Sequence, residues 1–247
     1  MTDRYALLAT AYTSFWRGVD WVFPPECAGC GAEGYQICPD CLQGIHYTSR
    51  ESCVYCGRKL KARGICPRCL QNPPAYTGVR CVAGFEGVIR QVVINLKYHA
   101  DLGLSLAAAE LMARLVQEEA WRPEMVVPVP LSVHRRRKRG YNQAAVLAFP
   151  LSLYLKLPMR TQALARLRDT RSQVGLNSQE RQDNVRGAFK ADPRLVRGKE
   201  ILLVDDVFTT GATLRAAAEA LRSAGCAQIQ VVTLAKALNS YSTFENA

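Results

Sequence analysis

The chain has 247 residues, of which 49% are hydrophobic, and its formal net charge is +11. A chain of this length and composition can bury a sizeable core, either as one large domain or as a domain with a small appendage. No apolar stretch approaches the roughly 20 residues that span a bilayer, so a membrane span is not predicted. The positive charge favours polyanionic partners such as nucleic acid and disfavours basic ones.

Residues 1–23 are predicted to form an amphipathic helix that ends before Phe23-Pro24-Pro25. Apolar side chains recur on one expected face at Leu8, Tyr12, Phe15, Trp16 and Val19. We expect this face to pack against the rest of the protein, and binding to a membrane surface is the alternative. No signal peptide is predicted, because Asp3 and Arg4 precede the apolar residues and no small-residue cleavage site follows. The expected location is the cytoplasm.

Eight of the ten cysteines lie in residues 24–72, where they form four CxxC pairs. The pairs are Cys27/Cys30, Cys38/Cys41, Cys53/Cys56 and Cys66/Cys69. A CxxC pair can present two thiolates to one metal ion, and two pairs complete a tetrahedral zinc site. We therefore predict a double zinc-binding module with one or two structural Zn²⁺ ions, which would largely hold this small, polar segment folded.

Two alternatives for these cysteines stay open at this point. A disulfide-rich secreted module has the same kind of composition, but the missing signal peptide disfavours it. Sequential pairing leaves seven residues between Cys30 and Cys38 and nine between Cys56 and Cys66, and a cross-braced pairing is also feasible. We expect the sequential pairing. Outside the pairs, His46 is predicted to be a surface residue, and Cys81 and Cys226 are predicted to be buried thiols.

Residues 75–238 show the alternation of strands and helices that is typical of an α/β domain, after a linker at Asn72-Pro73-Pro74. Apolar runs predict strands at 79–85, 125–129, 187–190, 201–204 and 228–234. Helical periodicity predicts helices at 88–98, 102–119 and 214–224. Residues 239–247 are expected to form a C-terminal tail.

Five consecutive basic residues, Arg135–Arg139, follow the predicted strand at 125–129. A parallel α/β fold places its ligand-binding loops after such strands. One or two positive charges suffice for a diphosphate, so the surplus indicates a longer polyanion such as single-stranded DNA. The candidate nucleic-acid contacts are Arg135, Arg136, Arg137, Lys138 and, as a stacking face, Tyr141. The alternative is a solvated basic helical turn without a specific role.

Residues 166–189 form a long polar stretch with few apolar positions. We predict a mobile loop here, with a short polar helix near Ser178–Asp183, because mobile lids cover reactive sugar phosphates in many enzymes. The polar candidates are Gln173, Arg181 and Asn184, of which Gln173 and Arg181 are the candidate catalytic residues. An ordinary surface loop is the alternative.

The most informative segment is 201–213, with the sequence ILLVDDVFTTGAT. The apolar residues 201–204 predict a buried parallel strand, after which Asp205 and Asp206 enter the crevice where ligands bind. The small, hydroxyl-bearing loop of Thr209, Thr210, Gly211 and Thr213 then leads into a helix and predicts a phosphate site. Two acids beside a phosphate site indicate a sugar phosphate. The alternative is a strand followed by a helix with simple capping residues.

These motifs, in this order, resemble the ComF family of competence-associated, phosphoribosyltransferase-like proteins. The resemblance covers nearly the whole chain from Cys27 to Leu234. It is carried by the four CxxC pairs, Leu96-Lys97-Tyr98, Val127-Pro128-Val129-Pro130, Arg139–Gln143, Gln173 with Arg181 and Asn184, and Val204-Asp205-Asp206 through Gly211. The implied fold is an α/β, type I phosphoribosyltransferase-like parallel sheet flanked by helices, with a small N-terminal zinc-ribbon module.

The resemblance implies that the chain binds phosphoribosyl pyrophosphate (PRPP) together with Mg²⁺. Asp205 and Asp206 would bind the ribose, and a loop containing Arg136, Arg137 and Arg139 would contact the pyrophosphate. The 5′-phosphate would lie against Thr209, Thr210, Gly211 and Thr213. The family also implies DNA uptake, with helicase-type competence proteins as partners. An enzyme, a DNA-binding module and a sensor of PRPP all remain open, because no segment with clear base-recognition residues stands out.

Overall fold

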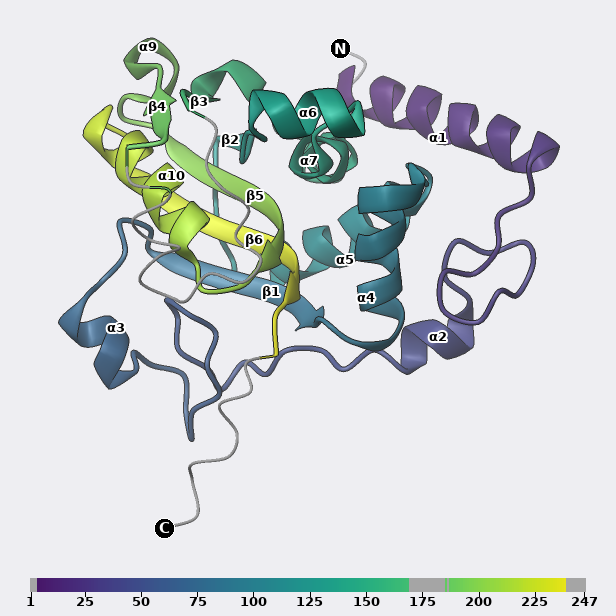
Figure 1. The fold of residues 1–247 in the computed structure, drawn as a ribbon, viewed down its shortest axis with the longest axis horizontal. Helices are drawn as coiled ribbons and strands as arrows, with labels where there is room; N and C mark the ends of the chain where they lie inside the picture. Colours follow the sequence, from purple (N-terminus) through teal and green to yellow (C-terminus); the bar gives the residue numbers. More distant parts are fainter. Residues whose placement is uncertain (1–3, 169–184, 186, 239–247) are drawn as a thin grey trace.

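The protein is built around a four-stranded parallel sheet with the strand order β1-β6-β5-β2 (Figure 1). The computed structural model describes residues 4–168, 185 and 187–238. The sheet contains β1 (Gly78–Gly84), β2 (Met125–Pro128), β5 (Glu200–Phe208) and β6 (Gln228–Lys236). A separate antiparallel pair is formed by β3 (Leu164–Arg166) and β4 (Phe189–Ala191). The α/β fold with a parallel sheet is therefore confirmed.

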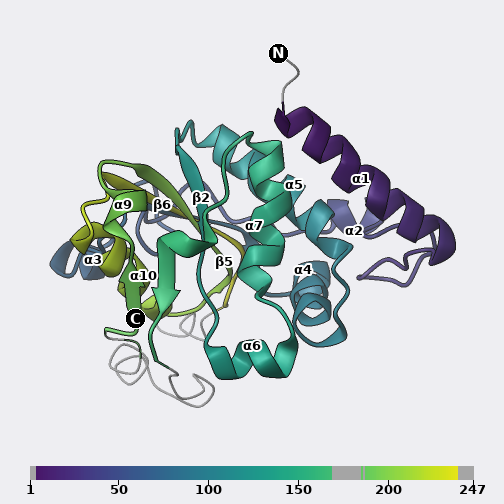
Figure 2. The same cartoon turned by 90° about the horizontal axis from the view of Figure 1, so that it is seen from above.

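Helices cover both faces of the sheet (Figure 2). One face packs against α10 (Ala212–Ser223). The other packs against α4 (Gly87–Ile94), α5 (Leu104–Glu118) and α7 (Gln143–Tyr154). All residues of β1 and β2 are buried, as are Ile201–Val204 of β5. Strands that are buried on both faces need continuous apolar runs, which is why these segments could be recognised in the sequence.

The strand predicted at 201–204 is longer than its apolar run, and β5 continues through Phe208. The reason is its parallel pairing with β6, which extends beyond the apolar run to Asp205 opposite Thr233, Val207 opposite Ala235 and Phe208 opposite Lys236. The strand thus extends past the apolar run from which it was predicted. Asp205 and Asp206 belong to the strand itself, at its carboxyl end, and the backbone ladder holds their positions.

The predicted helix at 88–98 changes its winding near its end. After α4, residues 95–99 form the π-helix η1 (Asn95–His99), which ends at Ala100 with a left-handed φ of 54°. A short π-helical segment shifts the directions in which its side chains point and often occurs at functional sites. The remaining short elements of the domain are η2 (Thr161–Ala163) and α9 (Pro193–Val196).

The basic run forms a helix, α6 (Val133–Arg139), and the expected pyrophosphate loop around Arg136–Arg139 is therefore wrong as a loop. The Ser132 hydroxyl caps the start of α6 by accepting a hydrogen bond from the Arg135 backbone N–H at 3.4 Å. Gly140 ends it with a φ of 84°, which favours glycine. Arginine and lysine are good helix formers, because their long side chains lose little freedom there.

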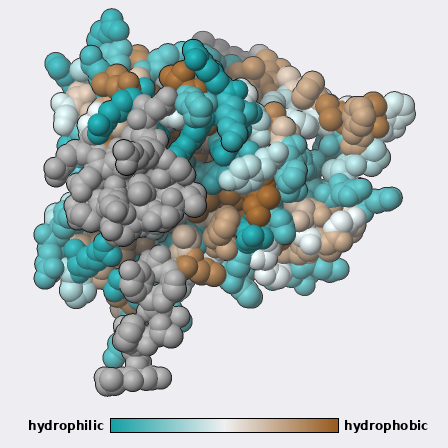
Figure 3. Space-filling view, in the orientation of Figure 1, coloured by the Kyte–Doolittle hydropathy of each residue, from teal (hydrophilic) through white to brown (hydrophobic). Residues whose placement is uncertain are grey.

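The N-terminal helix α1 (Arg4–Val22) lies against α7. The Tyr12 ring meets Phe149 edge-on with 5.0 Å between the ring centroids. The predicted inner face is partly wrong, because Leu8 and Phe15 are exposed while the half-buried stripe runs through Tyr5, Ala9, Tyr12, Trp16 and Val19. Apolar side chains also gather at the far end of α1, where Trp21, Val22 and Phe23 are exposed (Figure 3). No helix in the described part of the chain is long and apolar enough to cross a membrane.

The cysteine-rich segment runs along β1 and covers that edge of the sheet (Figure 1). Its short helices are α2 (Pro39–Gln43) and α3 (Pro67–Gln71). Backbone N–H groups of β1 reach into this segment, from Val79 to the Val54 carbonyl at 2.7 Å and from Gly84 to the His46 carbonyl at 3.3 Å. In the opposite direction, the Thr48 N–H donates to the Val82 carbonyl at 3.0 Å. The segment therefore satisfies backbone groups that an edge strand would otherwise expose.

An ion cluster around the buried Glu119 carboxylate ties the second half of this segment to the α/β domain. Glu119 follows α5, and its carboxylate lies 3.0 Å from Arg80 Nε of β1 and 2.5 Å from Arg63 of the cysteine-rich segment. The side chains of Arg80 and Glu119 are only 6% and 2% exposed. The neighbouring pair of Arg50 and Glu118 is 2.7 Å apart but lies at the surface.

Replacing Glu119 should therefore destabilise the protein far more than replacing Glu118. Glu119→Gln leaves the buried Arg80 charge without its counter-ion, and we expect a loss of about 3–5 kcal/mol in the free energy of unfolding. The matched control, Glu118→Gln, removes only a surface ion pair and should cost less than about 1 kcal/mol. Urea unfolding of both variants measures the difference. Equal losses would show that the buried cluster has no special role.

Candidate functional site

A pocket with two parts opens at the carboxyl end of β5. The two parts share Lys97, Asp205, Asp206 and Thr213, so the two acids lie between them. One part is bounded by the loop that follows β5, including Thr209 and Gly211. The other extends away from this loop towards Tyr98, Pro130, Leu131, Arg139, Gln143 and Arg166. The pocket thus lies at the edge of the parallel sheet where ligands of α/β proteins bind.

The first part has the form of a phosphate site at the start of α10. Gly211 adopts a left-handed φ of 77°, and a Cβ atom there would come within 2.8 Å of the Phe208 ring. Only glycine therefore fits this turn without a shift. Thr209 and Thr213 line the pocket, whereas the Thr210 hydroxyl accepts a hydrogen bond from the Ala212 N–H at 3.4 Å. The helix α10 has no acidic residue in its first turn, which keeps its positive dipole end available to an anion.

The two acids differ in their surroundings. Burial, together with the negative charge of Asp206, raises the pKa of Asp205 to about 7, although its Oδ1 accepts a hydrogen bond from the Asp206 N–H at 2.9 Å. Asp206 is paired with Lys97, whose Nζ lies 2.8 Å from Oδ2. Lys97 belongs to the π-helix η1, which thereby brings a cation to the acids.

Of the arginines predicted to contact a pyrophosphate, Arg139 lines the pocket. Arg136, Arg137 and Lys138 are exposed on α6, and Arg135 is half-buried. The Tyr141 hydroxyl donates to the Leu96 carbonyl at 2.7 Å, so this ring also joins the α6–α7 connection to η1. The candidates Gln173, Arg181 and Asn184, and the short helix expected near them, lie outside the described residues.

Sequence reasoning gave no role to several pocket residues. Lys97, Tyr98 and Gln143 belong to motifs on which the family resemblance rests, yet nothing in their spacing assigns them to the same site as the two acids. They come from η1 and from the start of α7, far from β5 in the chain. Their one sequence signal is that they follow strands predicted at 79–85 and 125–129, since ligand-binding segments of a parallel sheet follow its strands.

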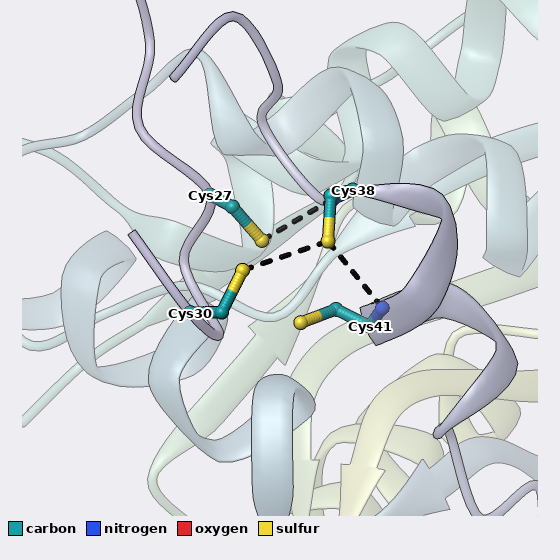
Figure 4. A group of neighbouring side chains, drawn as sticks. All are labelled: Cys27, Cys30, Cys38 and Cys41. Atoms are coloured by element: carbon teal, nitrogen blue, oxygen red, sulfur yellow. Dashed lines mark hydrogen bonds between the residues drawn. The ribbon is translucent and has the colours of Figure 1, made fainter. Parts of the chain in front are cut away.

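The eight paired cysteines form two groups of four, in the sequential pairing that the spacing favours. Cys27, Cys30, Cys38 and Cys41 make up one group (Figure 4), and Cys53, Cys56, Cys66 and Cys69 make up the other. Within each group, the four sulfur atoms lie within 4.8 Å of one another. His46 belongs to neither group, and its side chain is exposed beside Glu86. Cys81 and Cys226 are buried, as predicted.

The sulfur geometry fits zinc. A tetrahedral ion with Zn–S bonds of about 2.3 Å separates its sulfur ligands by about 3.8 Å. The Sγ atoms of Cys30 and Cys38 are 3.6 Å apart, and those of Cys56 and Cys66 are 3.8 Å apart. A disulfide would require about 2.05 Å, and all ten cysteines are free thiols. The disulfide alternative is therefore not supported.

Each group also contains one cysteine that favours the thiolate form, which is the form that binds metal. Burial alone would raise the pKa of Cys27, but backbone N–H groups of Cys38, Cys30 and Gly29 outweigh it and lower the pKa to about 6. In the same way, the pKa of Cys53 is lowered to about 7 by backbone N–H groups of Cys66, Tyr55 and Cys56. The sulfur atoms of Cys27 and Cys53 accept hydrogen bonds from the N–H groups of Cys38 and Cys66, at 3.2 Å and 3.3 Å.

Comparison with known proteins agrees with both parts of this description. A model of the phosphoribosyl transferase domain matches residues 98–243, and a model of the double zinc ribbon domain matches residues 18–70. "Competence protein F" of Haemophilus influenzae is 30% identical over 209 residues, which cover 81% of this chain and 90% of that protein. The chain belongs to the ComF family.

Two further relatives of this ComF-family chain come from other bacteria. "DNA utilization protein YhgH" of Escherichia coli K12 is 31% identical over 208 residues, covering 82% of this chain and 91% of that protein. "Competence protein ComFC" of Bacillus subtilis 168 is 24% identical over 217 residues, covering 85% and 84% of the two chains. The double zinc ribbon model and the two four-cysteine groups together support structural zinc in this ComF-family chain.

We expect two zinc ions per chain, one for each cysteine group. Cys30→Ser or Cys56→Ser should each lower the zinc content from about two ions to about one, because a tetrahedral structural site needs its four ligands. Atomic emission spectroscopy of the purified proteins measures this content. Cys226→Ser is the matched control, since it replaces a buried thiol outside both groups, and it should retain two ions. One zinc ion in the unaltered protein would contradict the prediction.

Proposed function

We propose that this ComF-family chain binds PRPP with Mg²⁺ in the pocket and single-stranded DNA on its basic surface, and that it acts in DNA uptake or nucleotide handling. The family assignment supports the role in DNA handling, because relatives that align over most of the chain are called competence or DNA utilization proteins. The phosphoribosyl transferase domain model supports the ligand. The cytoplasm is the proposed location, where reducing conditions keep zinc-binding thiols available.

The arrangement of charge along the pocket carries the PRPP assignment. The two acids have a phosphate-type loop on one side and Arg139 on the other, while Lys97 lies beside the acids themselves. A ligand that fits this order has an anion at each end and hydroxyl groups in between. PRPP has this form, with a 5′-phosphate, two vicinal ribose hydroxyls and a pyrophosphate.

Each part of the pocket then has a distinct task. The N–H groups at the start of α10 and the hydroxyls of Thr209 and Thr213 bind the 5′-phosphate. Asp205 and Asp206 accept hydrogen bonds from the ribose hydroxyls, and Arg139 provides charge-assisted donors to the pyrophosphate. The acids also suit Mg²⁺, which prefers oxygen ligands and, when bound, neutralises the charge of the leaving group.

Two basic surfaces support the DNA assignment. The first is α6, where Arg136, Arg137 and Lys138 are exposed. The second surface is the second zinc ribbon, which holds Cys53, Cys56, Cys66 and Cys69, whereas the first ribbon holds Cys27, Cys30, Cys38 and Cys41. No acidic residue occurs between Glu51 and Glu86, and the exposed basic residues of the second ribbon are Arg58, Lys59, Lys61, Arg63 and Arg68. The first ribbon has the opposite character, with no lysine or arginine between Arg17 and Arg50.

Because the two ribbons differ in charge, we expect only the second ribbon to contact a nucleic acid. The backbone phosphates of a nucleic acid favour the second ribbon and are repelled by Glu26, Glu33 and Asp40 of the first. Lys236, at the carboxyl end of β6, donates to the Gly57 carbonyl of the second ribbon. We therefore propose that single-stranded DNA contacts α6 and the second ribbon. A helicase-type partner of the uptake machinery stays a prediction.

PRPP binding should strengthen as the pH rises through about 7. Below its pKa, Asp205 carries a proton that it must lose before it can accept hydrogen bonds from the ribose, so binding is weaker in acid. We expect an increase of about tenfold in affinity between about pH 6 and about pH 8. Calorimetric titration of Mg²⁺–PRPP measures it.

The variant Asp205→Asn separates this effect from the ionisation of the ligand. Ionisation of the pyrophosphate group of PRPP affects binding to both proteins equally. Only the unaltered protein also loses a proton from Asp205. The variant should bind PRPP more weakly at pH 8 and show a flatter pH dependence. An unchanged affinity in Asp205→Asn combined with Asp206→Asn would refute the assignment of the acids to the ribose.

Affinity for single-stranded DNA should fall steeply with salt and depend on α6. Arg136→Ala combined with Arg137→Ala should weaken binding and reduce the slope of log K against log salt by about 1.4, since two phosphate contacts are lost. Lys59→Ala combined with Lys61→Ala should act in the same direction. Fluorescence anisotropy with labelled oligothymidylate over a salt series measures both slopes.

The control for charge alone is Arg114→Ala combined with Arg194→Ala. Both side chains are exposed, they lie on α5 and α9, and they pair with Glu110 and Asp192. This control also removes two positive charges, but it should leave the slope of log K against log salt nearly unchanged. If all three double variants lose affinity equally, the DNA contact is not confined to α6 and the second ribbon.

A second candidate is a magnesium-dependent phosphoribosyltransferase with a nucleobase acceptor and no DNA role. The observation that favours it is the extent of the pocket beyond the acids, towards Tyr98 and Gln143. Release of pyrophosphate from PRPP in the presence of a base distinguishes this enzyme from a protein that binds PRPP without turnover.

A further inference from the structure

One exposed side of the N-terminal helix α1 carries an apolar stripe. The helix lies at the rim of the molecule, against α7 (Figures 1 and 2). Large apolar residues recur on the stripe every seven positions, and small residues lie between them. The five residues of this stripe are all exposed, and they are Leu8, Ala11, Phe15, Gly18 and Val22. An exposed apolar surface of this kind indicates a site that another molecule covers.

The spacing of the stripe is that of a seam between two helices. Its residues follow one another at alternating intervals of three and four, the repeat with which paired helices meet. In a parallel pair of two copies, each position meets itself, so Phe15 would face Phe15 and Gly18 would face Gly18. In an antiparallel pair, Phe15 lies beside Gly18 of the other copy, and Val22 lies beside Ala11. Large residues then face small ones throughout, which allows close packing.

The charges around α1 also favour the antiparallel direction. Glu26 follows the helix and forms a β-bridge with Glu33, and both residues are exposed. An antiparallel second copy brings its own Arg4, and the positive dipole end of its α1, towards these acids. The same acids repel a nucleic acid and an anionic membrane surface. A second copy of the chain is therefore the occupant that suits both the stripe and its surroundings.

Aromatic rings enlarge the apolar surface at the carboxyl end of α1. Phe15, Trp21 and Phe23 are 62%, 86% and 73% exposed. These rings expose about 300–550 Å² in each copy, so two copies contribute about 600–1,100 Å². With Leu8 and Val22 added, this surface approaches the about 1,200 Å² of the smaller specific interfaces, and it stays below the about 2,000 Å² of obligate ones. The area suits a reversible dimer.

We infer that the stripe on α1 is an interface between two copies of this chain, which pair antiparallel about a two-fold axis. Such an axis requires a surface that is complementary to itself. The alternation of large and small residues gives α1 this property. The stripe shares no residue with the pocket or with the two basic surfaces, so the dimer and the proposed function stand or fall separately.

Sedimentation velocity of the full-length protein over a concentration series measures the equilibrium between monomer and dimer. Phe15→Glu places a charge on the seam and should raise the dissociation constant of the dimer about tenfold or more. Thr10→Glu is the matched control, because Thr10 is an exposed residue of α1 outside the stripe, and this variant should dimerise as the unaltered protein does. An unchanged zinc content shows that the variants fold.

Gly18→Leu separates close packing from general stickiness. A Cβ atom at Gly18 meets nothing within 4 Å in the chain itself, so the monomer accommodates a side chain there. The added leucine enlarges the apolar surface, which would strengthen binding to a membrane or non-specific association. It also fills the space that Phe15 of the other copy needs, and we therefore expect the dimer to weaken about fivefold or more.

An exchange of charges tests the antiparallel direction. Arg4→Glu and Glu26→Arg should each weaken the dimer severalfold, because each places like charges near each other across the interface. The two substitutions in one chain should restore dimerisation, since opposite charges then meet again. Failure of this restoration would refute the antiparallel pairing.

A protein that stays monomeric at every concentration would overturn the inference. Dimerisation that Phe15→Glu leaves unchanged, or that Thr10→Glu weakens equally, would do the same. Flotation with phosphatidylglycerol vesicles tests the membrane as the alternative occupant. If the protein floats, and Gly18→Leu strengthens this binding while Phe15→Glu abolishes it, the stripe belongs to a membrane contact and not to a dimer.

Discussion

Two adjacent carboxylates at the end of a buried strand impose the constraint around which the pocket is arranged. The β5–β6 ladder continues past the apolar run and places Asp205 and Asp206 where water is partly excluded. Two negative charges so close together repel each other, which raises the pKa of Asp205 to about 7 after burial has already disfavoured its charge. Lys97 offsets the charge of Asp206 at 2.8 Å. The local charge balance of the pocket therefore depends on Lys97 and on the protonation of Asp205.

The double zinc ribbon has a structural relation to this pocket. It covers β1, the edge strand of the sheet, with backbone hydrogen bonds at Val79, Val82 and Gly84. It is also joined to the domain by the exposed Arg63, which pairs with Glu119 beside the buried Arg80. Metal ligation that orders the ribbon therefore protects the sheet edge as well. The ribbon and the α/β domain consequently depend on each other for stability.

The charges that make up the net charge of +11 are unevenly distributed along the chain. The basic residues concentrate on α6 and on the second ribbon, while the first ribbon is acidic. Like charges in one region would repel unless a polyanion neutralised them, so this distribution suits a nucleic-acid strand better than a single diphosphate. The two zinc ribbons have the same ligand set but present opposite charges to a partner.

Local patterns in the sequence determined a large part of the protein. The four CxxC pairs identified the eight metal ligands, while the structure selected the sequential grouping over the cross-braced one. The run 201–204 specified the central strand, and the small, hydroxyl-bearing residues around Gly211 indicated the loop before α10. These features depend on neighbours close in the chain, and they could be recognised without the fold.

Only the tertiary structure decided what surrounds the acids. The strand extends to Phe208 because β6 pairs with it along its carboxyl end. Lys97, Tyr98 and Gln143 reach the pocket from segments that precede β5 by more than fifty residues in the sequence, and no local pattern predicts such a meeting. Long-range packing alone brings them together, and for this reason the sequence indicated the acids and the phosphate-type loop but not the other residues that line the same pocket.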